Sequence, residues 1–336
     1  MAERVTILGN GAMGTVCAIL LRQGGHDVTM WGANAASIQR LSGDRVQHRL
    51  LPGVAVPADV TLTANDAQAL VDCTMILSAI PTQHMRATWG RLRQYVPAAV
   101  PIVSAAKGIE TQTMLRPSQI IADVLAGGRG GITNPLAVIS GPNIAAEIAR
   151  CLPATAVVAA DDDAVAGRVQ LALTTPWFRP YTNCDVTGVE LAGATKNVIA
   201  IAAGILDGLG AGNNAKSSLV TRGLVEISRL GAAMGAQPST FAGLAGLGDL
   251  ITTCISPEGR NRAVGEQLGR GRKLPDILAG MNSVAEGVPT TKAVRTLAAR
   301  HGVEMPIAEE VYAILFENKD IHSALSDLMT REPKPE

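Results

Sequence analysis

The chain has 336 residues, of which 47% are apolar and 17% are charged. This length is large for a single hydrophobic core and the composition is that of a globular protein, so we expect two domains and exclude a disordered chain. Lys plus Arg and Asp plus Glu both number 29, which excludes the net positive charge typical of proteins that bind nucleic acid or anionic membranes. A local cluster of cations must therefore hold any anionic ligand.

The cysteines and the start of the chain predict a cytoplasmic protein. The five cysteines show no CxxC pair and no metal-type spacing, so we expect no metal site and interpret them as buried free thiols in a reducing compartment (Cys17, Cys73, Cys151, Cys184 and Cys254). The first residues, MAERVTILGNG, lead directly into a strand and leave no room for a signal peptide. We expect no membrane span, because Ile199–Leu206 is interrupted by glycine and followed by Asp207.

In chain order, the first half alternates short β-branched runs with helix-length segments. The predicted strands are Arg4–Leu8, Asp27–Trp31, Thr74–Ile80, Pro101–Ala106, Leu136–Gly141, Ala154–Ala160 and Trp177–Thr182. The helix-length segments include Thr15–Arg22, Gln83–Tyr95 and Ser118–Leu125, and Asp161–Asp163 is typical of a solvated helix start. This alternation predicts an α/β fold whose N-terminal domain is Rossmann-type, with a doubly wound, mainly parallel sheet covered by helices on both faces.

The pattern changes after about Val186, where helical periodicity replaces β alternation. We therefore predict a dinucleotide-binding domain over residues 1–187, an all-α substrate-binding and catalytic domain over 188–330, and a polar tail over 331–336. Lys196 and Asn197 lie near the middle of ELAGATKNVIAIAAG, on the first predicted helix of the second domain. Burying an ammonium group is costly without a paired charge or a lowered pKa, so this lysine needs an explanation.

A glycine-rich segment follows the first predicted strand and predicts a dinucleotide site. Gly9–Gly14 reads GNGAMG, a G-x-G-x-x-G pattern between a strand and a helix. In this arrangement Gly9 makes the tight turn, Gly11 lets the backbone approach a pyrophosphate, and Gly14 lets helix and strand pack closely. The helix N-terminus then offers N–H groups to the phosphates. The alternative is a glycine-rich turn without a ligand.

The end of the second strand bears on the choice of cofactor. NAD-binding sites usually carry an acid there, on the ribose 2′-hydroxyl, whereas this strand closes with Trp31-Gly32-Ala33-Asn34. NADP or NAD is therefore expected, with a slight lean to NADP. Arg40, on the following helix, is the cation that we expect within reach of a 2′-phosphate.

Several polar residues stand in apolar or glycine-rich surroundings and are candidates for the reaction site. Each also has a simpler explanation: Lys107 as a solvated loop charge, Asp249 as a helix N-cap, and Arg260-Asn261 as part of a surface turn. Lys196 is the hardest to explain in this way, because its flanks are apolar.

A series of short segments distributed along the chain resembles the NAD(P)-dependent glycerol-3-phosphate dehydrogenase family. In chain order, these segments are GNGAMGT, AAKGIE, VISGP, GATKNVIAIAAGILDGLG, KSSLVTRGL, AGLGDLITTC, GRNR, VAEGVPTT and GVEMPI. The resemblance spans almost the whole chain and implies a Rossmann domain followed by a helical domain. It also implies an oxidoreductase that interconverts dihydroxyacetone phosphate and sn-glycerol 3-phosphate, supplies phospholipid synthesis, and forms a homodimer through the helical domain.

The resemblance also assigns roles to individual residues. Lys196 corresponds to the general acid/base lysine and Lys107 to a lysine that touches substrate and cofactor, and we assign Asp249 to orienting Lys196. The substrate-binding positions that it implies are Lys107, Gly141, Asn143, Lys196, Asn197, Asp249, Thr253, Gly259, Arg260 and Asn261. The implied cofactor-binding positions are Gly9, Gly11, Ala12, Met13, Gly14, Lys107, Ala145, Arg260, Val284 and Glu286. Arg260 has the planar fork that suits a phosphate.

The chain departs from the family pattern at four places, which together comprise six residues. Ala12 and Met13 replace a serine and an aromatic residue, Ala33 replaces an arginine or histidine, Asn143-Ile144 replaces Ser or Thr followed by Phe, and Gly259 replaces a serine. Two alternatives therefore stay open: a reductase of the same architecture that acts on another small phosphorylated or carboxylated ketone, and a non-catalytic dinucleotide-binding sensor.

Overall fold

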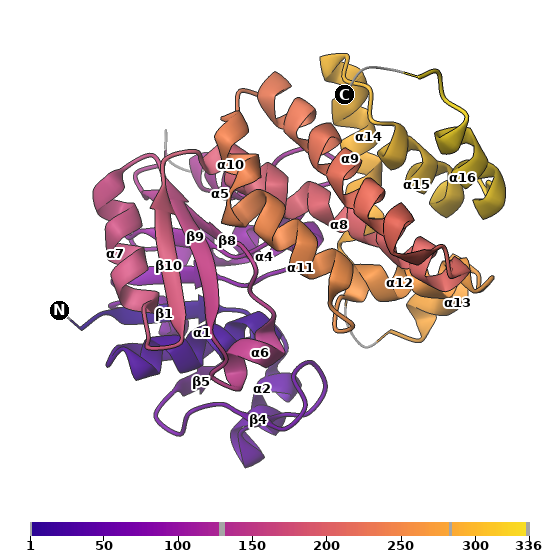
Figure 1. The fold of residues 1–336 in the computed structure, drawn as a ribbon. Helices are drawn as coiled ribbons and strands as arrows, with labels where there is room; N and C mark the ends of the chain where they lie inside the picture. The colour runs from indigo at the N-terminus through magenta and orange to yellow at the C-terminus, as the bar shows by residue number, and fades with distance from the viewer. Residues whose placement is uncertain (1, 128–131, 282–283, 334–336) are drawn as a thin grey trace. The chain divides into compact units, whose positions relative to one another are not determined.

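The computed structural model describes residues 2–127, 132–281 and 284–333, and the last three residues of the predicted polar tail lie outside them. The chain divides into two compact units (Figure 1). Unit 1 comprises residues 1–108 and 115–190, and unit 2 comprises residues 109–114 and 191–336. We describe each unit by itself.

Unit 1 is built on an eight-stranded sheet with the order β10-β9-β8-β7-β6-β1-β2-β5. Its strands are β1 (Arg4–Leu8), β2 (Asp27–Trp31), β5 (Thr61–Thr63), β6 (Met75–Ser78), β7 (Ile102–Ser104), β8 (Leu136–Ser140), β9 (Ala154–Ala160) and β10 (Phe178–Asn183). All neighbouring pairs are parallel except β8 and β9, which are antiparallel. β1 lies between β2 and β6, so the strand order reverses there, and ligands bind parallel sheets at the carboxyl ends of strands at such a point.

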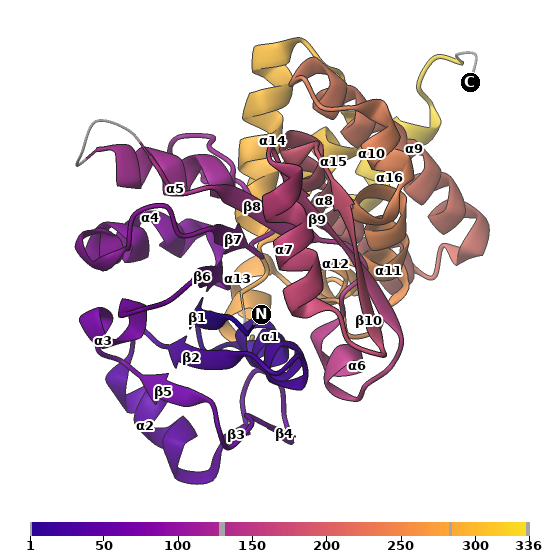
Figure 2. The same ribbon diagram turned by 90° about the vertical axis from the view of Figure 1, so that its left-hand side faces the viewer.

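Two apolar cores cover the two faces of this sheet. One core gathers side chains of α1 (Ala12–Gln23) and α7 (Asp163–Leu173) with those of alternate strand residues, and α6 (Ala145–Ala149) packs with α1. The other contains Trp31 and Trp89 and lies under α3 (Asp66–Leu70), α4 (Thr82–Leu92) and α5 (Pro117–Ala126), of which α4 and α5 lie side by side (Figure 2). Helices on both faces make this the doubly wound arrangement.

The predicted fold class is confirmed, and the differences lie in short elements. The bounds of β1, β2 and β9 match the predicted strands, whereas the strands within Thr74–Ile80 and Pro101–Ala106 are shorter. The helix expected around Arg40 after the second strand is α2 (Ala35–Asp44), whereas the hairpin of β3 (Val46–Gln47) and β4 (Val54–Ala55) and the edge strand β5 were not predicted. These strands have two or three residues, too few for an alternating pattern to show. Asp162 caps α7, as the acidic run predicts.

Unit 2 contains helices and no strand among its described residues. Its helices are α8 (Val186–Leu209, which begins in unit 1), α9 (Gly212–Ala233), α10 (Pro238–Ala242), α11 (Asp249–Ile255), α12 (Arg260–Gly269), α13 (Leu274–Ala279), α14 (Gly287–His301), α15 (Pro306–Phe316) and α16 (Ile321–Met329). Alanine, leucine and isoleucine side chains of α8 form the centre of its core.

α8 is a longer apolar segment than was expected from the sequence. Of the helices in the described residues, α8 alone is long and apolar enough, by length and composition, to cross a membrane, and no such segment was expected. Within the protein, 89% of its apolar window is buried, which is the behaviour of a central core helix. The glycines of α8 do not end the apolar run, because glycine is close to neutral in hydropathy and the mean hydropathy of the window is still 1.5. Gly204 and Gly208 pack against the backbone of α12.

The cysteines give a correction. Cys17, Cys73 and Cys254 are buried as expected, whereas Cys151 and Cys184 are exposed. Cys151 follows α6 with a positive φ of 59°, so the chain turns there at the surface. Burial raises the pKa of the Cys17 thiol to about 12, which leaves it unreactive.

Candidate active site

The loop between β1 and α1 has the geometry that its glycines predict. Gly9 adopts a φ of +118°, and a Cβ atom there would lie 2.8 Å from the carbonyl oxygen of Ala79, which follows β6. A Cβ at Gly14 would lie 2.0 Å from the carbonyl oxygen of Gly9, so glycine is required for the helix to pack on the strand. At Gly11, by contrast, the nearest atom is the Leu50 Cδ1 at 3.5 Å, so this position has room that a Cβ would fill.

Gly11 is also the N-cap of α1, which then begins at Ala12 and Met13. The first N–H groups of a helix have no partner inside it and carry partial positive charge, so they suit a phosphate. The neighbouring Asn10 is fixed from both sides, since its carbonyl oxygen accepts from Gln47 Nε2 at 2.8 Å and its amide donates to Ser37 Oγ at 2.9 Å. Gln47 lies in the β3–β4 hairpin, which sequence reasoning missed.

The loop after β2 consists of Gly32, Ala33 and Asn34 and contains no acidic residue. Asn34 caps α2 through its side chain, which accepts from Ser37 N at 3.0 Å. Arg40 is exposed on α2, and a different cation meets this loop: Arg91 of α4 donates to the carbonyl oxygen of Ala33 at 3.3 Å. Sequence reasoning missed Arg91 because 58 residues separate it from Ala33.

Lys107 and Asn143 meet at the carboxyl ends of neighbouring strands. Lys107 follows β7 and Gly141–Asn143 follow β8, and these two strands are parallel. The Lys107 ammonium donates to the carbonyl oxygen of Gly141 at 2.9 Å and to Asn143 Oδ1 at 2.7 Å. Lys107 is half-buried and hydrogen-bonded, so it is not the solvated loop charge of the simpler explanation. Ala145 begins α6 just beyond this pair.

Lys196 is paired, which answers the question of its burial. Its ammonium forms an ion pair with Asp249 and donates to Thr253 Oγ1 at 2.6 Å. Lys196 is 5% exposed and Asp249 is 2% exposed. A buried ammonium is tolerated when a carboxylate and further hydrogen bonds replace its hydration shell. The Asp249 carboxylate favours the charged form of Lys196, so the amine is held with its protons.

A π-helical turn brings Asp249 to this position. The turn spans Leu244–Gly248 and leads directly into α11, whose first residue is Asp249. Within it, a Cβ at Gly246 would lie 2.1 Å from the carbonyl oxygen of Phe241, so the GLAGLGDL motif permits a backbone path that bulkier residues would block. Gly248 rather than Asp249 is the N-cap, and the aspartate side chain remains available to Lys196. π-helical turns of this kind often occur at functional sites.

The other predicted residues of unit 2 meet where α12 and α14 begin. Arg260, the first residue of α12, is exposed and donates to the carbonyl oxygen of Val284 at 3.0 Å. Asn261 is buried, and its Oδ1 accepts from Gly287 N at 2.9 Å at the start of α14, one residue after Glu286. Asn197 donates to the carbonyl oxygen of Gly193, one turn back along α8, at 3.3 Å.

Gly259, which replaces a family serine, is the N-cap of α12. A Cβ there would lie 3.0 Å from the carbonyl oxygen of Thr253 and 3.2 Å from that of Ser256. The turn is therefore tighter than most side chains accept, which gives this departure a steric reason.

Helices α8 and α12 pack closely within unit 2, and they carry Lys196 and Arg260, respectively. A Cβ at Gly204 would lie 1.9 Å from the carbonyl oxygen of Arg262, and one at Gly265 would lie 1.9 Å from that of Ile201. Gly208 and Gly269 repeat this contact one turn further on, at 2.3 Å and 2.5 Å. We call these four residues the glycine clasp. This packing was not predicted, although a Gly-x-x-x-Gly spacing on each helix is a signal for it.

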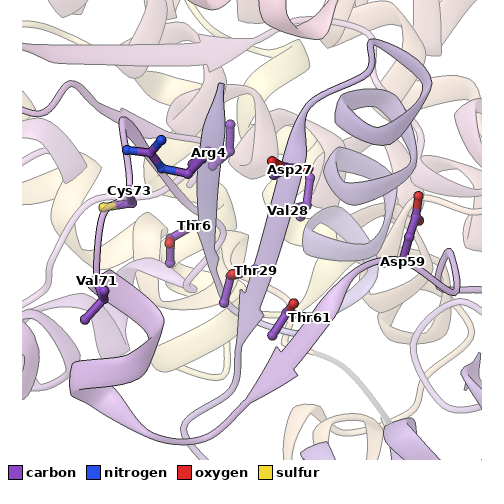
Figure 3. A pocket seen from close by; sticks show the side chains of 10 residues that line it. Arg4, Thr6, Asp27, Val28, Thr29, Asp59, Thr61, Val71 and Cys73 are labelled. Atoms are coloured by element: carbon purple, nitrogen blue, oxygen red, sulfur yellow. The ribbon is translucent and has the colours of Figure 1, made fainter. Parts of the chain in front are cut away.

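A hollow of about 190 Å³ lies at the opposite, amino-terminal ends of β1, β2 and β5 (Figure 3). Its polar groups include Arg4 and Thr6. The Arg4 Nε donates to the carbonyl oxygen of Asp72 at 2.6 Å, and the Thr6 hydroxyl donates to the carbonyl oxygen of Ala69 at 2.5 Å. These bonds tie β1 to the segment around α3, so the groups have a structural role. No group of three or more metal-ligating side chains occurs among the described residues.

The structure thus brings the predicted residues together in three local groups: the glycine loop, Lys107 with Gly141 and Asn143, and the residues of unit 2 around Lys196 and Arg260. A dinucleotide-type loop at the switch point of a doubly wound sheet, and a buried lysine–aspartate pair in a helical unit, are the features of a nicotinamide-dependent dehydrogenase.

Comparisons with known proteins give the particular family. Family models described as the NAD-dependent glycerol-3-phosphate dehydrogenase N-terminus and C-terminus match residues 4–166 and 185–326. The chain belongs to this family. It is 47% identical to a glycerol-3-phosphate dehydrogenase [NAD(P)+] of Citrifermentans bemidjiense over 100% of this chain and 99% of that protein.

Two further comparisons agree. The chain is 46% identical to the protein of the same name from Streptomyces avermitilis, over 99% of this chain and 98% of that protein. The crystal structure of glycerol-3-phosphate dehydrogenase from Coxiella burnetii matches with a TM-score of 0.93 and 33% identity, over 98% of this chain and 99% of that chain. The family resemblance in the sequence is thereby confirmed.

Proposed function

We propose that this protein is an oxidoreductase that interconverts dihydroxyacetone phosphate and sn-glycerol 3-phosphate, with NADPH or NADH as hydride donor. The observation that carries the proposal is the buried Lys196–Asp249 pair, since such a pair supplies a proton donor where a ketone is reduced. Family membership and relatives named for this reaction support the substrate. A sensor that only binds a dinucleotide has no need of a buried, paired ammonium group.

The glycine loop suits the pyrophosphate of a dinucleotide, because Gly11 leaves room for it and the start of α1 offers N–H groups. When bound, a reduced nicotinamide supplies the hydride that adds to the carbonyl carbon. Gly9, Gly11, Ala12, Met13 and Gly14 would hold the cofactor in unit 1. Ala145 in unit 1, and Arg260, Val284 and Glu286 in unit 2, are the further cofactor positions that the family resemblance implies.

In the proposed mechanism Lys196 donates one ammonium proton to the carbonyl oxygen as that oxygen gains charge. Asp249 and Thr253 orient the amine through the contacts described above and favour its protonated form before the reaction. The proton passes to the new hydroxyl group, and Lys196 then recovers a proton from solvent. The reverse reaction returns the proton to the neutral amine.

Cations and amides would bind the rest of the substrate. We assign the phosphate to Arg260, whose planar fork gives paired donors, with Gly259 and Asn261 beside it at the start of α12. Lys107 would approach both substrate and cofactor, held by Gly141 and Asn143, and Asn197 would contact the substrate beside Lys196. We also propose a cytoplasmic homodimer that supplies glycerol 3-phosphate for phospholipid synthesis.

A direct assay tests the reaction. Purified protein is mixed with dihydroxyacetone phosphate and NADPH or NADH, and cofactor oxidation is followed by absorbance. Turnover with at least one cofactor is expected, and its absence with both would refute the proposed reaction. Lys196→Ala should lower kcat by about 10²–10⁴-fold without weakening cofactor binding, whereas the exposed Lys273→Ala should leave kcat unchanged. Arg260→Ala should chiefly raise KM for dihydroxyacetone phosphate.

A further inference from the structure

The loop after β2 carries no group of its own that would read the 2′ position of the cofactor ribose. In dinucleotide-binding sheets this position lies at the end of the second strand, where an acid takes the 2′-hydroxyl or an arginine takes the 2′-phosphate. Here the loop offers Gly32, Ala33 and Asn34, and the Asn34 side chain is used to cap α2. Specificity must therefore come from elsewhere in unit 1.

Arg91 of α4 brings a guanidinium group to this loop. Besides its bond to the carbonyl oxygen of Ala33, its Nε and a terminal nitrogen each lie 2.6 Å from an oxygen of Asp66. The guanidinium carbon lies 5.3 Å from the centre of the Trp31 ring, and the Trp31 indole N–H donates to Asp66 at 3.1 Å. Trp31 closes β2, so this arginine is attached to the end of the second strand.

The geometry is fixed rather than incidental. Trp31 is 1% exposed and so gives the guanidinium an immobile platform, while Asp66, as the first residue of α3, holds it in a two-pronged ion pair. The Arg91 side chain is 45% exposed, so it remains open to a ligand. A planar guanidinium still has N–H groups to offer a phosphate beyond the two that Asp66 takes.

We infer that Arg91 is a specificity-determining residue that favours a 2′-phosphate on the cofactor, and that Asp66 moderates this preference. The inference rests on the proposed use of a nicotinamide dinucleotide. A 2′-phosphate gains a charge-assisted hydrogen bond to the guanidinium, whereas a 2′-hydroxyl gains little. Because the Asp66 carboxylate cancels much of the positive charge, the gain for a 2′-phosphate is limited, and neither group repels the neutral 2′-hydroxyl of NADH. The protein therefore binds both cofactors and prefers NADPH.

Direct binding tests this without turnover. Dissociation constants for NADPH and NADH are measured by titration calorimetry at one ionic strength, for the wild type and for Arg91→Gln, Arg91→Lys and Asp66→Asn. Arg91→Gln should weaken NADPH binding by about tenfold or more and change NADH binding by less than about threefold. Arg91→Lys keeps the charge but loses the planar fork of donors, so its affinity for NADPH should lie between those of the wild type and Arg91→Gln. Asp66→Asn should increase the preference for NADPH.

The exposed Arg93, two residues along the chain, provides a matched control, because Arg93→Gln removes the same charge. An unchanged ratio of the two dissociation constants in Arg91→Gln, or an equal change in Arg93→Gln, would overturn the inference. If the wild type bound neither cofactor, the proposed dinucleotide site would fail instead. Circular dichroism verifies that each variant is folded. If Arg91→Gln does not fold, the ratio of the two dissociation constants in Arg91→Lys tests the inference instead.

Discussion

The Lys196–Asp249 pair predicts a double-mutant cycle with an unusual outcome. Both side chains are almost completely buried, at 6% and 3% exposure, so removal of one partner leaves the other charge in the core of unit 2. Lys196→Met and Asp249→Leu should therefore each lower the free energy of unfolding by about 3–5 kcal/mol. A domain is stable by only about 5–15 kcal/mol in total, so each loss will be easy to measure.

The double variant should recover most of this loss. Methionine and leucine together fill the space without either charge, and buried pairs replaced by apolar residues of similar volume are often neutral in stability. We therefore expect Lys196→Met/Asp249→Leu to be more stable than either single variant, with a coupling energy of several kcal/mol between the two sites. Turnover should stay absent, because the proton donor is gone.

Urea unfolding at constant pH provides the measurement, with two signals that separate the units. All three tryptophans, Trp31, Trp89 and Trp177, lie in unit 1, so their fluorescence follows that unit. Far-UV circular dichroism includes the helices of unit 2 and should carry the larger shift. If the double variant instead lost the sum of the two single losses, the residues would be energetically independent, and the account of Lys196 as a charge-compensated core residue would be wrong.

Three further predictions concern stability, pH and the Lys107 contact. Gly265→Ala should destabilise the protein by at least about 2 kcal/mol, since its Cβ would lie 1.9 Å from a backbone oxygen of α8, whereas Gly167→Ala, with no atom within 4 Å, should be neutral or slightly stabilising in the same urea experiment. Burial raises the pKa of Glu226 from 4.5 to about 7, so the folded state binds its proton more tightly and the free energy of unfolding should fall by up to about 3 kcal/mol as pH rises through this window. Glu226→Gln should abolish that slope, and an unchanged slope would assign it to other groups. Asn143→Ala removes an acceptor of the Lys107 ammonium and should lower kcat/KM about tenfold, while Asn143→Asp keeps an acceptor and should lose less; equal losses would show that this hydrogen bond is unimportant.

Local patterns in the sequence were sufficient to predict the sheet and its glycine loop. β1 and β2 have the predicted bounds, because a buried parallel strand is a short β-branched run that ends in glycine or a polar residue. The roles of Gly9 and Gly14 follow from spacing, since a tight turn and a close helix–strand contact each need a residue without a Cβ atom. The β3–β4 hairpin and β5 were not predictable in this way, because strands of two or three residues are held by tertiary contacts.

Contacts between residues that lie far apart in the chain could not be predicted from such local patterns. Asp66 and Arg91 are 25 residues apart, and each is an ordinary charged helix residue when viewed alone. Their joint position at the end of β2 depends on how α3 and α4 pack against the Trp31 face of the sheet. The glycine clasp is similar: the spacing of its residues was visible, but the partner helix was not. Sequence reasoning therefore did not single out these residues, and only the structure pairs them.

Asn143 shows how such a pairing changes the meaning of a departure from the family pattern. From the sequence, Asn143 is an implied substrate-binding position at which asparagine replaces a family serine or threonine. In the structure its Oδ1 lies 2.7 Å from the Lys107 ammonium, and the carbonyl oxygen of Gly141 is the second acceptor there. An amide oxygen extends one atom further from the backbone than a hydroxyl does, so at this position it can reach the lysine. The substitution therefore acts first on the placement of Lys107, and any effect on substrate follows from where Lys107 is held.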